Sequence, residues 1–169
     1  QASYATSMLF LGTIIGCPAC GWLSDKIRRR KLPMIVGATL SLILVMAIMY
    51  IPQASLPDYM ALFFLLGFTT STQVISYPLL AEHNPLAITS TAISVVSFTV
   101  MVSGIVAQPL FGYFMTLTHH AAAIHANIYS AASYHHAMMI MPIGFVLALI
   151  IALGVKETYC KSDAPELEE

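Results

Sequence analysis

The sequence PMIVGATLSLILVMAIMYI runs from Pro33 to Ile51 without a charged residue. It follows the basic run KIRRRK, residues 26–31, after one intervening leucine. A helix needs about 20 apolar residues to cross a hydrocarbon core of about 30 Å. Because no water is present in that core, the backbone must satisfy its own hydrogen bonds, which a helix does within one segment. This stretch therefore predicts a membrane-spanning helix.

Four further apolar stretches of this kind accompany it. The 169 residues are 58% hydrophobic and only 9% charged, whereas soluble domains carry about 25% charged residues. This composition excludes a soluble enzyme, a nucleic-acid-binding protein and a disordered regulator. We expect an all-α, polytopic transmembrane helix bundle over residues 1–155, with about five membrane-spanning helices at roughly 4–23, 33–51, 59–80, 86–117 and 137–155.

The charged residues predict how these spans are oriented. Five spans place the segments 24–32, 81–85 and 156–169 on one side of the membrane, and all seven Lys and Arg residues fall in these segments. The connections 52–58 and 118–136 contain none. Lys and Arg in short loops mark the cytoplasmic side. We therefore expect a multi-pass protein of the bacterial inner (cell) membrane with a cytoplasmic C-terminal tail over residues 156–169.

The basic loop carries a motif with fixed spacing. It reads GWLSDKIRRRK and fits the pattern G-x-x-x-D-[RK]-x-x-R-[RK], with the defining residues Gly21, Asp25, Lys26, Arg29 and Arg30. In this form and position the loop resembles the signature loop of the major facilitator superfamily, which follows the second or eighth helix of a twelve-helix transporter fold. The family usually has a second glycine where Arg28 stands.

The resemblance implies that this loop is a conformational latch. Asp25 is a carboxylate suited to the positive N-terminus of another helix, and the resemblance implies that this helix belongs to the opposite half of the transporter. It also implies that an arginine of the loop pairs with an acid of its own half. Glu82 is the only acid in the other short loop on this side, so we expect it to pair with Arg29 or Arg30.

The same loop has a simpler interpretation that is compatible with a latch. Gly21 is expected to let neighbouring helices approach closely at the membrane boundary. Lys26 and the arginines can pair with carboxylates or with anionic lipid head groups. The basic run could therefore serve only to fix the orientation in the membrane and to bind lipid.

The order of the spans predicts which half of a transporter this is. The motif loop follows the first predicted span, and four spans and a polar tail follow the loop. Together with the resemblance, this order predicts helices eight to twelve, the C-terminal half. The chain opens at Gln1 almost directly into a span, so we expect it to be cut from a longer chain whose missing N-terminal half is its partner. The alternative is a naturally truncated, non-transporting membrane component that binds a partner or lipid.

Polar side chains form a stripe on the predicted helix 86–117. Its members are spaced four or three residues apart, which is helical periodicity: Ser90, Ser94, Ser97, Met101, Gly104 and Gln108. A glutamine in hydrocarbon needs a bonding partner or a wet cavity. We interpret a set of residues from this helix and from 59–80 as a candidate substrate path, with hydrogen bonds between helices as the alternative: Gln73, Tyr77, Ser94, Ser97 and Gln108. The resemblance supports the path, because the tenth and eleventh helices of the family contribute to it.

These features predict a secondary active transporter that moves a small polar solute, such as an amino acid or another metabolite, by alternating access. A multidrug efflux antiporter of the same superfamily is the alternative. The resemblance favours proton coupling, but no Asp, Glu, Lys, Arg or His lies inside the predicted spans to carry the proton. The same absence argues against an intramembrane protease, and we expect no enzymatic activity, no cofactor and no nucleic-acid partner.

Histidines and cysteines, which can bind metals, occur in two places, and we expect neither group to form a metal site. The connection 118–136 contains five histidines, His119, His120, His125, His135 and His136. We interpret this connection as a solvated or interfacial loop with a short helix at residues 121–133. The alternatives are a pH sensor and a zinc, copper or nickel site, and we expect no metal. Cys17 and Cys20 lie inside the first span, and we interpret them as small packing residues rather than as a redox or zinc pair.

Overall fold

The computed structural model describes residues 2–51, 55–122, 131–157 and 159, and within these ranges it contains helices and no strand. The chain begins with two long helices and a third that is interrupted by a 3₁₀ turn. Another long helix and a final broken helix complete the bundle. The elements are α1 (Ala2–Ile27), α2 (Lys31–Tyr50), α3 (Leu56–Thr70), the 3₁₀ helix η1 (Ser71–Ile75), α4 (Ser76–Glu82), the 3₁₀ turn η2 (Leu86–Ile88), α5 (Thr89–Ala122), α6 (Ala131–Met138) and α7 (Ile140–Gly154).

Five helical segments are long and apolar enough to cross a membrane. They are Ser3–Ile27, Lys31–Tyr50, Leu56–Glu82, Thr89–Thr116 and Tyr134–Gly154. The predicted all-α bundle with about five spans is therefore confirmed. The third span begins earlier than the predicted residue 59, because Ser55 and Asp58 form a capping box ahead of it.

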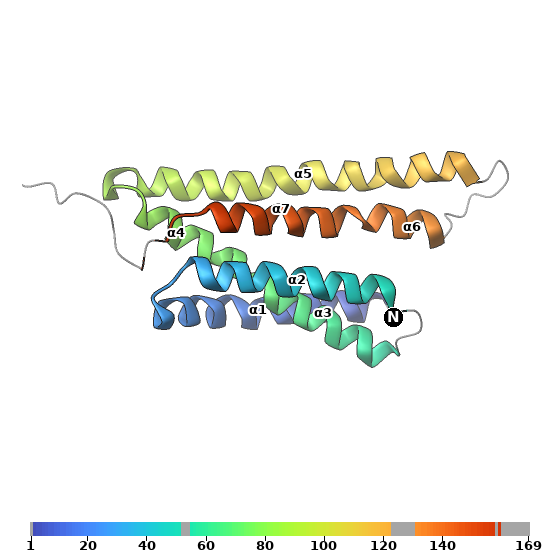
Figure 1. Ribbon diagram of the computed structural model, residues 1–169, viewed down its shortest axis with the longest axis horizontal. Helices are drawn as coiled ribbons and strands as arrows, with labels where there is room; N and C mark the ends of the chain where they lie inside the picture. Colours follow the sequence, from blue (N-terminus) through green and yellow to red (C-terminus); the bar gives the residue numbers. More distant parts are fainter. Residues whose placement is uncertain (1, 52–54, 123–130, 158, 160–169) are drawn as a thin grey trace, which may run out of the picture.

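The helices lie side by side and run alternately in opposite directions (Figure 1). One end of the bundle carries the turn between α1 and α2, the turn between α4 and α5, and the chain that leaves α7 (Figure 1). We call this end the basic end, because it carries Lys26, Lys31 and the arginines between them. The alternation that the sequence predicted thus brings the three connecting segments of one side together.

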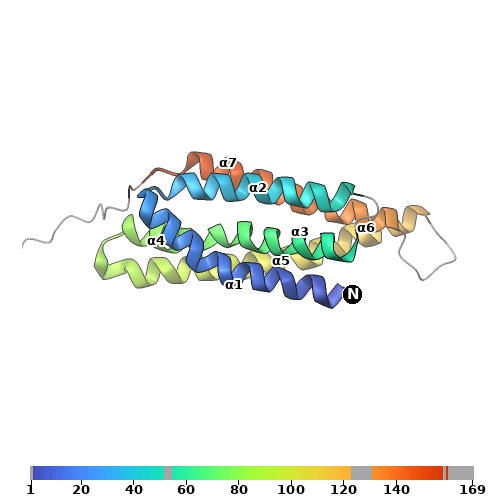
Figure 2. The ribbon, with the colours of Figure 1, turned by 90° about the horizontal axis from the view of Figure 1, so that it is seen from below.

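The helices α1 and α3 pack closely, backbone against backbone. A Cβ atom added to Gly12 would lie 2.1 Å from the carbonyl oxygen of Phe64, and one added to Gly67 would lie 2.0 Å from that of Leu9. Small residues are what allow two membrane helices to approach in this way. The glycines at both positions therefore let the α1 and α3 backbones touch, and the two helices run side by side in Figure 2.

The third span is broken at its polar segment. Between α3 and α4, residues Ser71–Ile75 form a 3₁₀ helix. Pro78 follows in the first turn of α4, and since proline has no backbone N–H, the carbonyl of Val74 loses its usual helical donor. A 3₁₀ stretch in the middle of a helix often marks a hinge or a functional site.

The side chains at this break pack against α1 and α2. Thr69 accepts a hydrogen bond of 2.9 Å from Ser41 of α2. Cys20 is buried, and its Sγ lies 3.6 Å from the hydroxyl oxygen of Ser71. Cys17 is half-buried, and both thiols are free, which agrees with the interpretation of these cysteines as small packing residues.

The helix α5 is largely exposed. It contacts α4 and α6 at its two ends, no residue of its most apolar stretch is buried inside the protein, and Met115 near the end of the span is the buried exception among its described side chains. It also continues to Ala122, beyond the predicted end at residue 117. The short helix expected over 121–133 falls largely on residues 123–130, which lie outside the described residues.

Candidate functional site

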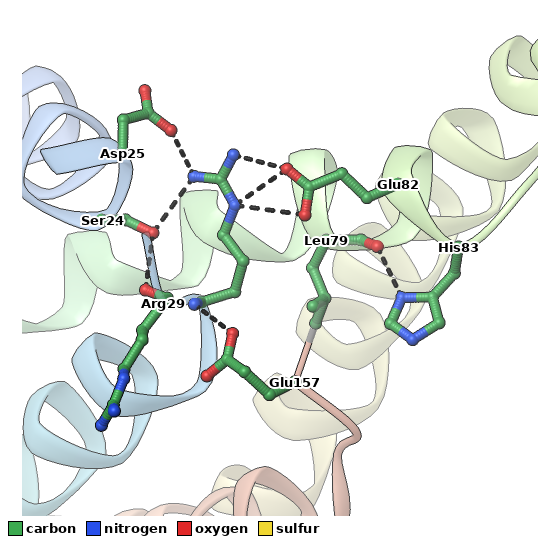
Figure 3. Close-up of polar contacts among 8 residues, drawn as sticks. Ser24, Asp25, Arg29, Leu79, Glu82, His83 and Glu157 are labelled. Atoms are coloured by element: carbon green, nitrogen blue, oxygen red, sulfur yellow. Dashed lines mark hydrogen bonds and ion pairs between the residues drawn. The ribbon is translucent and has the colours of Figure 1, made fainter. Parts of the chain in front are cut away.

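The guanidinium of Arg30 is the centre of an ionic cluster at the basic end. Its side chain is only 8% exposed. It donates hydrogen bonds to the carboxylate of Asp25 at 2.5 Å and to the hydroxyl of Ser24 at 3.1 Å. A second carboxylate, that of Glu82, accepts from Nη2 at 2.6 Å and from Nε at 3.1 Å (Figure 3). Two acids from different helices thus share one buried cation, an arrangement in which charge-assisted hydrogen bonds are strong.

The direction of Arg30 is set by the way α1 ends. The N–H of Arg28 donates to the carbonyl of Asp25 at 3.2 Å, and that of Arg29 donates to the carbonyl of Ser24 at 3.3 Å. This pair of bonds is the Schellman motif, whose central residue takes a left-handed conformation and is usually glycine. Arg28 occupies that place with φ 54°. The geometry therefore explains why a glycine suits this position and shows that Arg28 is held in a conformation unfavourable for a residue with a Cβ.

A third carboxylate closes the N-terminus of α2. Glu157 follows α7 and accepts hydrogen bonds from the backbone N–H groups of Arg30, at 2.6 Å, and of Lys31, at 3.0 Å. These N–H groups belong to the start of a helix, where the helix dipole favours a negative charge. In return, the ammonium of Lys31 donates to the carbonyl of Leu153 at the end of α7, at 2.6 Å. The ends of α2 and α7 therefore cap each other.

The acid Glu82 is held in place by the local structure at the end of α4. The ring nitrogen Nδ1 of His83 lies 2.8 Å from the carbonyl oxygen of Leu79 (Figure 3). The side-chain amide of Asn84 donates to the carbonyl of Leu80 at 2.7 Å. These side chains add donors to carbonyls in the last turn of the helix, of which that of Leu79 also accepts the backbone N–H of His83. They support the turn from which Glu82 reaches Arg30.

The structure distinguishes between the motif residues that the sequence grouped together. Of the two arginines considered as partners of Glu82, Arg30 makes the contact, whereas Arg29 points away from the carboxylates of the cluster (Figure 3). Lys26 lies over the ring of Trp22, with 4.7 Å between Nζ and the ring centroid. The close helix approach expected at Gly21 is not found in the described part of the chain, because nothing lies within 4 Å of a Cβ built there.

The predicted path residues fall near two cavities. A cavity of about 300 Å³ between α2, the broken span and α7 is lined by Gln73 together with the hydroxyls of Ser41, Thr70 and Thr72. A larger groove of about 910 Å³ lies between α5 and α7 and is also bordered by Leu9, Val45 and Leu66 of the first three helices. It is lined by Gln108 and otherwise mostly by apolar side chains. Thr70 borders both.

The other predicted path residues lie outside these cavities. Tyr77 is half-buried in α4 and lines neither of them. The hydroxyls of Ser94 and Ser97 donate to carbonyls of their own helix, those of Ser90 and Ile93. The structure thus brings Gln73 and Gln108 to adjoining cavities but leaves the two serines on an exposed stretch of α5.

The histidines of the connection after α5 are only partly described. His119 and His120 fall in α5, His135 and His136 fall in α6, and His125 lies outside the described residues. The ring of His135 meets the ring of Tyr50 edge-on, with 5.4 Å between the centroids. Within the described ranges, no three His, Cys, Asp or Glu side chains are grouped in a way that could hold a metal ion.

The comparison with known families agrees with this architecture. No curated protein and no solved structure matches the chain. The sequence profile of the Major Facilitator Superfamily matches residues 1–167, which is nearly the whole chain. The protein therefore belongs to the Major Facilitator Superfamily of membrane transporters and is an integral, multi-pass membrane protein.

Proposed function

We propose that the chain forms helices eight to twelve of a secondary active transporter that moves a small polar solute, such as an amino acid or another metabolite, by alternating access. The observation that carries this proposal is the break in the third span, where Gln73 lines a cavity beside the 3₁₀ turn Ser71–Ile75. Substrate sites of secondary transporters are typically built at discontinuous helices near the middle of the bilayer.

The chemistry of that cavity supports a small polar solute. Its polar lining residues are Ser41, Thr70, Thr72 and Gln73, whereas the other five are apolar and none is charged. The three hydroxyls donate within the protein, to Thr69 or to backbone carbonyls, so Gln73 is the polar side chain that a solute would use. Gln73 is exposed, and it reaches this cavity from the 3₁₀ turn. An amide can both donate and accept, so it is free to bind a neutral or zwitterionic solute.

The missing N-terminal half is the proposed partner of this chain. The helix α3 packs against both α1 and α2, whereas the space between α5 and α7 is an open, mostly apolar groove. A further membrane helix from the preceding part of the transporter would fill this groove, with Gln108 between it and the path. In the same arrangement, Asp25 would meet a helix N-terminus of the other half, since its side chain is 65% exposed.

The proposed orientation puts the basic end in the cytoplasm of a bacterial cell, at the inner membrane. Lys and Arg gather at this end, and this asymmetry marks the cytoplasmic side. A single cysteine introduced at Lys26 should then react with a membrane-impermeant reagent only in inside-out vesicles. Reaction from the outside of intact cells would contradict the orientation. Both assays use a background in which the native cysteines are replaced.

The experiment that tests the proposed function is transport by the full-length protein reconstituted into proteoliposomes. We expect uptake of labelled amino acids or small metabolites, and Gln73→Ala should raise the half-saturation concentration about tenfold, the effect of losing one good hydrogen bond to the solute. Thr99→Ala is the matched control, because its hydroxyl bonds to its own helix and lines neither cavity. A pH gradient imposed across the membrane tests proton coupling.

The alternative, a multidrug efflux antiporter, is favoured by the apolar lining of the groove between α5 and α7. Extrusion of cationic dyes without uptake of any polar metabolite would support it against our proposal. If neither activity appears in a correctly inserted full-length protein, the chain is a non-transporting component and the proposal is wrong.

A further inference from the structure

A third cavity, of about 420 Å³, opens at the basic end beside the first turns of α2. We propose that this groove binds the head group of an anionic phospholipid. Two cations, Arg29 and Lys31, line it together with Tyr159, and an apolar wall completes it. This site is separate from the proposed substrate path, so the lipid proposal can be tested without knowing the transported solute.

The cationic part of the groove has a free guanidinium. Arg29 is exposed and points away from the two carboxylates that bind Arg30, those of Asp25 and Glu82 (Figure 3). Among the described residues its side chain has no acidic partner. The carboxylate of Glu157 also borders the groove, but it is engaged by the two N–H groups at the start of α2. The guanidinium of Arg29 therefore remains available to a phosphodiester, and Lys31, whose ammonium donates one hydrogen bond to the carbonyl of Leu153, keeps two further N–H donors.

The apolar part of the groove leads into the membrane. Leu32, Ile35 and Val36 form its wall. From Leu32 an exposed stripe continues along α2 through Val36, Leu40 and Ile43, which are 41%, 47%, 44% and 57% exposed, respectively. Residues spaced by four, four and three positions share one face of a helix. A molecule with an anionic head and a long apolar tail matches both parts, whereas a soluble phosphate would use only the cations.

The charge of the whole basic end favours the same ligand. Its described side chains include six cations, Lys26, Arg28, Arg29, Arg30, Lys31 and Lys156, against three acids, Asp25, Glu82 and Glu157. Basic residues beside a membrane helix attract anionic lipids, and each contributes at the surface. Tyr159 also lines the groove, and tyrosine is a residue type that favours the lipid–water interface.

Fluorescence quenching by brominated lipids tests the site directly. The substitutions Trp22→Phe and Leu32→Trp give a full chain whose single tryptophan is at residue 32. This variant is reconstituted into phosphatidylcholine vesicles that contain either brominated phosphatidylglycerol or brominated phosphatidylcholine. We expect phosphatidylglycerol to bind about fivefold more strongly beside residue 32, the preference that one well-placed cation provides. A tryptophan placed at Ile43 instead should be quenched equally by both lipids.

Two arginine variants separate a defined site from diffuse charge. Arg29→Gln should abolish most of the preference, whereas Arg28→Gln removes the same charge from an exposed neighbour that does not line the groove and should leave the preference in place. Equal losses in both variants, or equal quenching by both lipids in the parent protein, would overturn the proposal. A preference that appears only after residues 160–169 are removed would also overturn it, since the acidic tail would then be the occupant.

Native mass spectrometry of the unaltered chain provides a second measurement in case the tryptophan variants do not insert. The detergent-solubilised protein should retain one more phosphatidylglycerol than phosphatidylcholine molecule at equal lipid concentrations. Arg29→Gln should remove that difference and Arg28→Gln should keep it. Retention of both lipids in equal number would contradict the site.

Discussion

Arg30 and Glu82 are separated by 52 positions in the sequence, yet their side chains meet at 2.6 Å. The contact ties the turn after α1 to the end of α4, so one ion pair fixes two of the three connections at the basic end. Both side chains are largely buried, at 8% and 15% exposure. Removing one partner of such a pair leaves the other charge without full compensation.

The first prediction concerns this pair. Glu82→Gln should lower the free energy of unfolding by about 2 kcal/mol, because the amide keeps the shape but not the charge that faces Arg30. The full chain in detergent can be compared by thermal unfolding with Lys156→Gln, which removes an exposed charge that forms no ion pair among the described residues. In the double variant Glu82→Gln/Arg30→Gln, part of the loss should be recovered. Strictly additive losses would mean that the two side chains do not interact.

The second prediction concerns the cap that Glu157 forms on α2. Glu157→Gln should destabilise the start of α2 by about 1 kcal/mol, since the charge that faces the helix dipole is lost while one acceptor oxygen remains. Hydrogen exchange at the amides of Arg30 and Lys31 should become faster. Lys156→Gln, which changes the exposed neighbour, should leave this exchange unchanged. Equal exchange in the parent protein and the Glu157 variant would show that the cap does not form.

The third prediction follows from the left-handed conformation of Arg28. Arg28→Gly should raise the stability by about 1 kcal/mol, because glycine adopts φ near 54° without the steric cost of a Cβ atom. Arg28→Ala removes the same charge but keeps the Cβ, so it should give no such gain. If both substitutions stabilise the protein equally, the benefit comes from charge and not from the backbone.

The length and charge of the segments were sufficient to predict the main architecture. Each span is a local run of apolar residues, and the basic residues between the first two spans mark one end of the bundle. The meeting of the basic loop, Glu82 and the C-terminal segment at that end follows from the number of spans alone. These features depend on short stretches of sequence, so they can be read without the tertiary structure.

Features that depend on the direction of one side chain could not be read in this way. The choice of Arg30 over Arg29 depends on the Schellman turn, in which Arg28 reverses the chain before α2. The cap by Glu157 depends on where α7 ends in space, although an acid just after the last span was visible. Pro78 was a usable signal for the break at Ser71–Ile75, because proline removes a helical hydrogen bond four residues earlier.

The fourth prediction concerns the α1–α3 contact. Gly12→Ala should destabilise the protein by about 2 kcal/mol, because the added methyl group would lie 2.1 Å from the carbonyl oxygen of Phe64 and force the two backbones apart. Gly112→Ala in α5 is the matched control, since nothing lies within 4 Å of a Cβ at that position. The control should be neutral or slightly stabilising, because alanine is the better helix former. Similar melting temperatures for both variants would show that α1 and α3 do not approach this closely.

The fifth prediction separates the ion pair from the proposed latch at Asp25. One oxygen of Asp25 binds Arg30, but the side chain as a whole is 65% exposed, so its replacement should cost little stability. If the exposed carboxylate meets a helix N-terminus of the other half, Asp25→Asn should nevertheless lower the transport rate of the full-length protein about tenfold, since a contact made in only one conformational state shifts the balance between states.

The measurement is initial transport in proteoliposomes that contain equal amounts of inserted protein, with Lys156→Gln as the control for loss of an exposed charge. Glu82→Gln supplies the contrast, because it should lower the melting temperature as well as the rate. An unaltered rate in the Asp25 variant would exclude the latch while leaving the ionic cluster intact. A loss of rate that merely follows the loss of stability would assign Asp25 to the fold alone. Only slowed transport in a protein of normal stability fits a carboxylate that acts between the two halves.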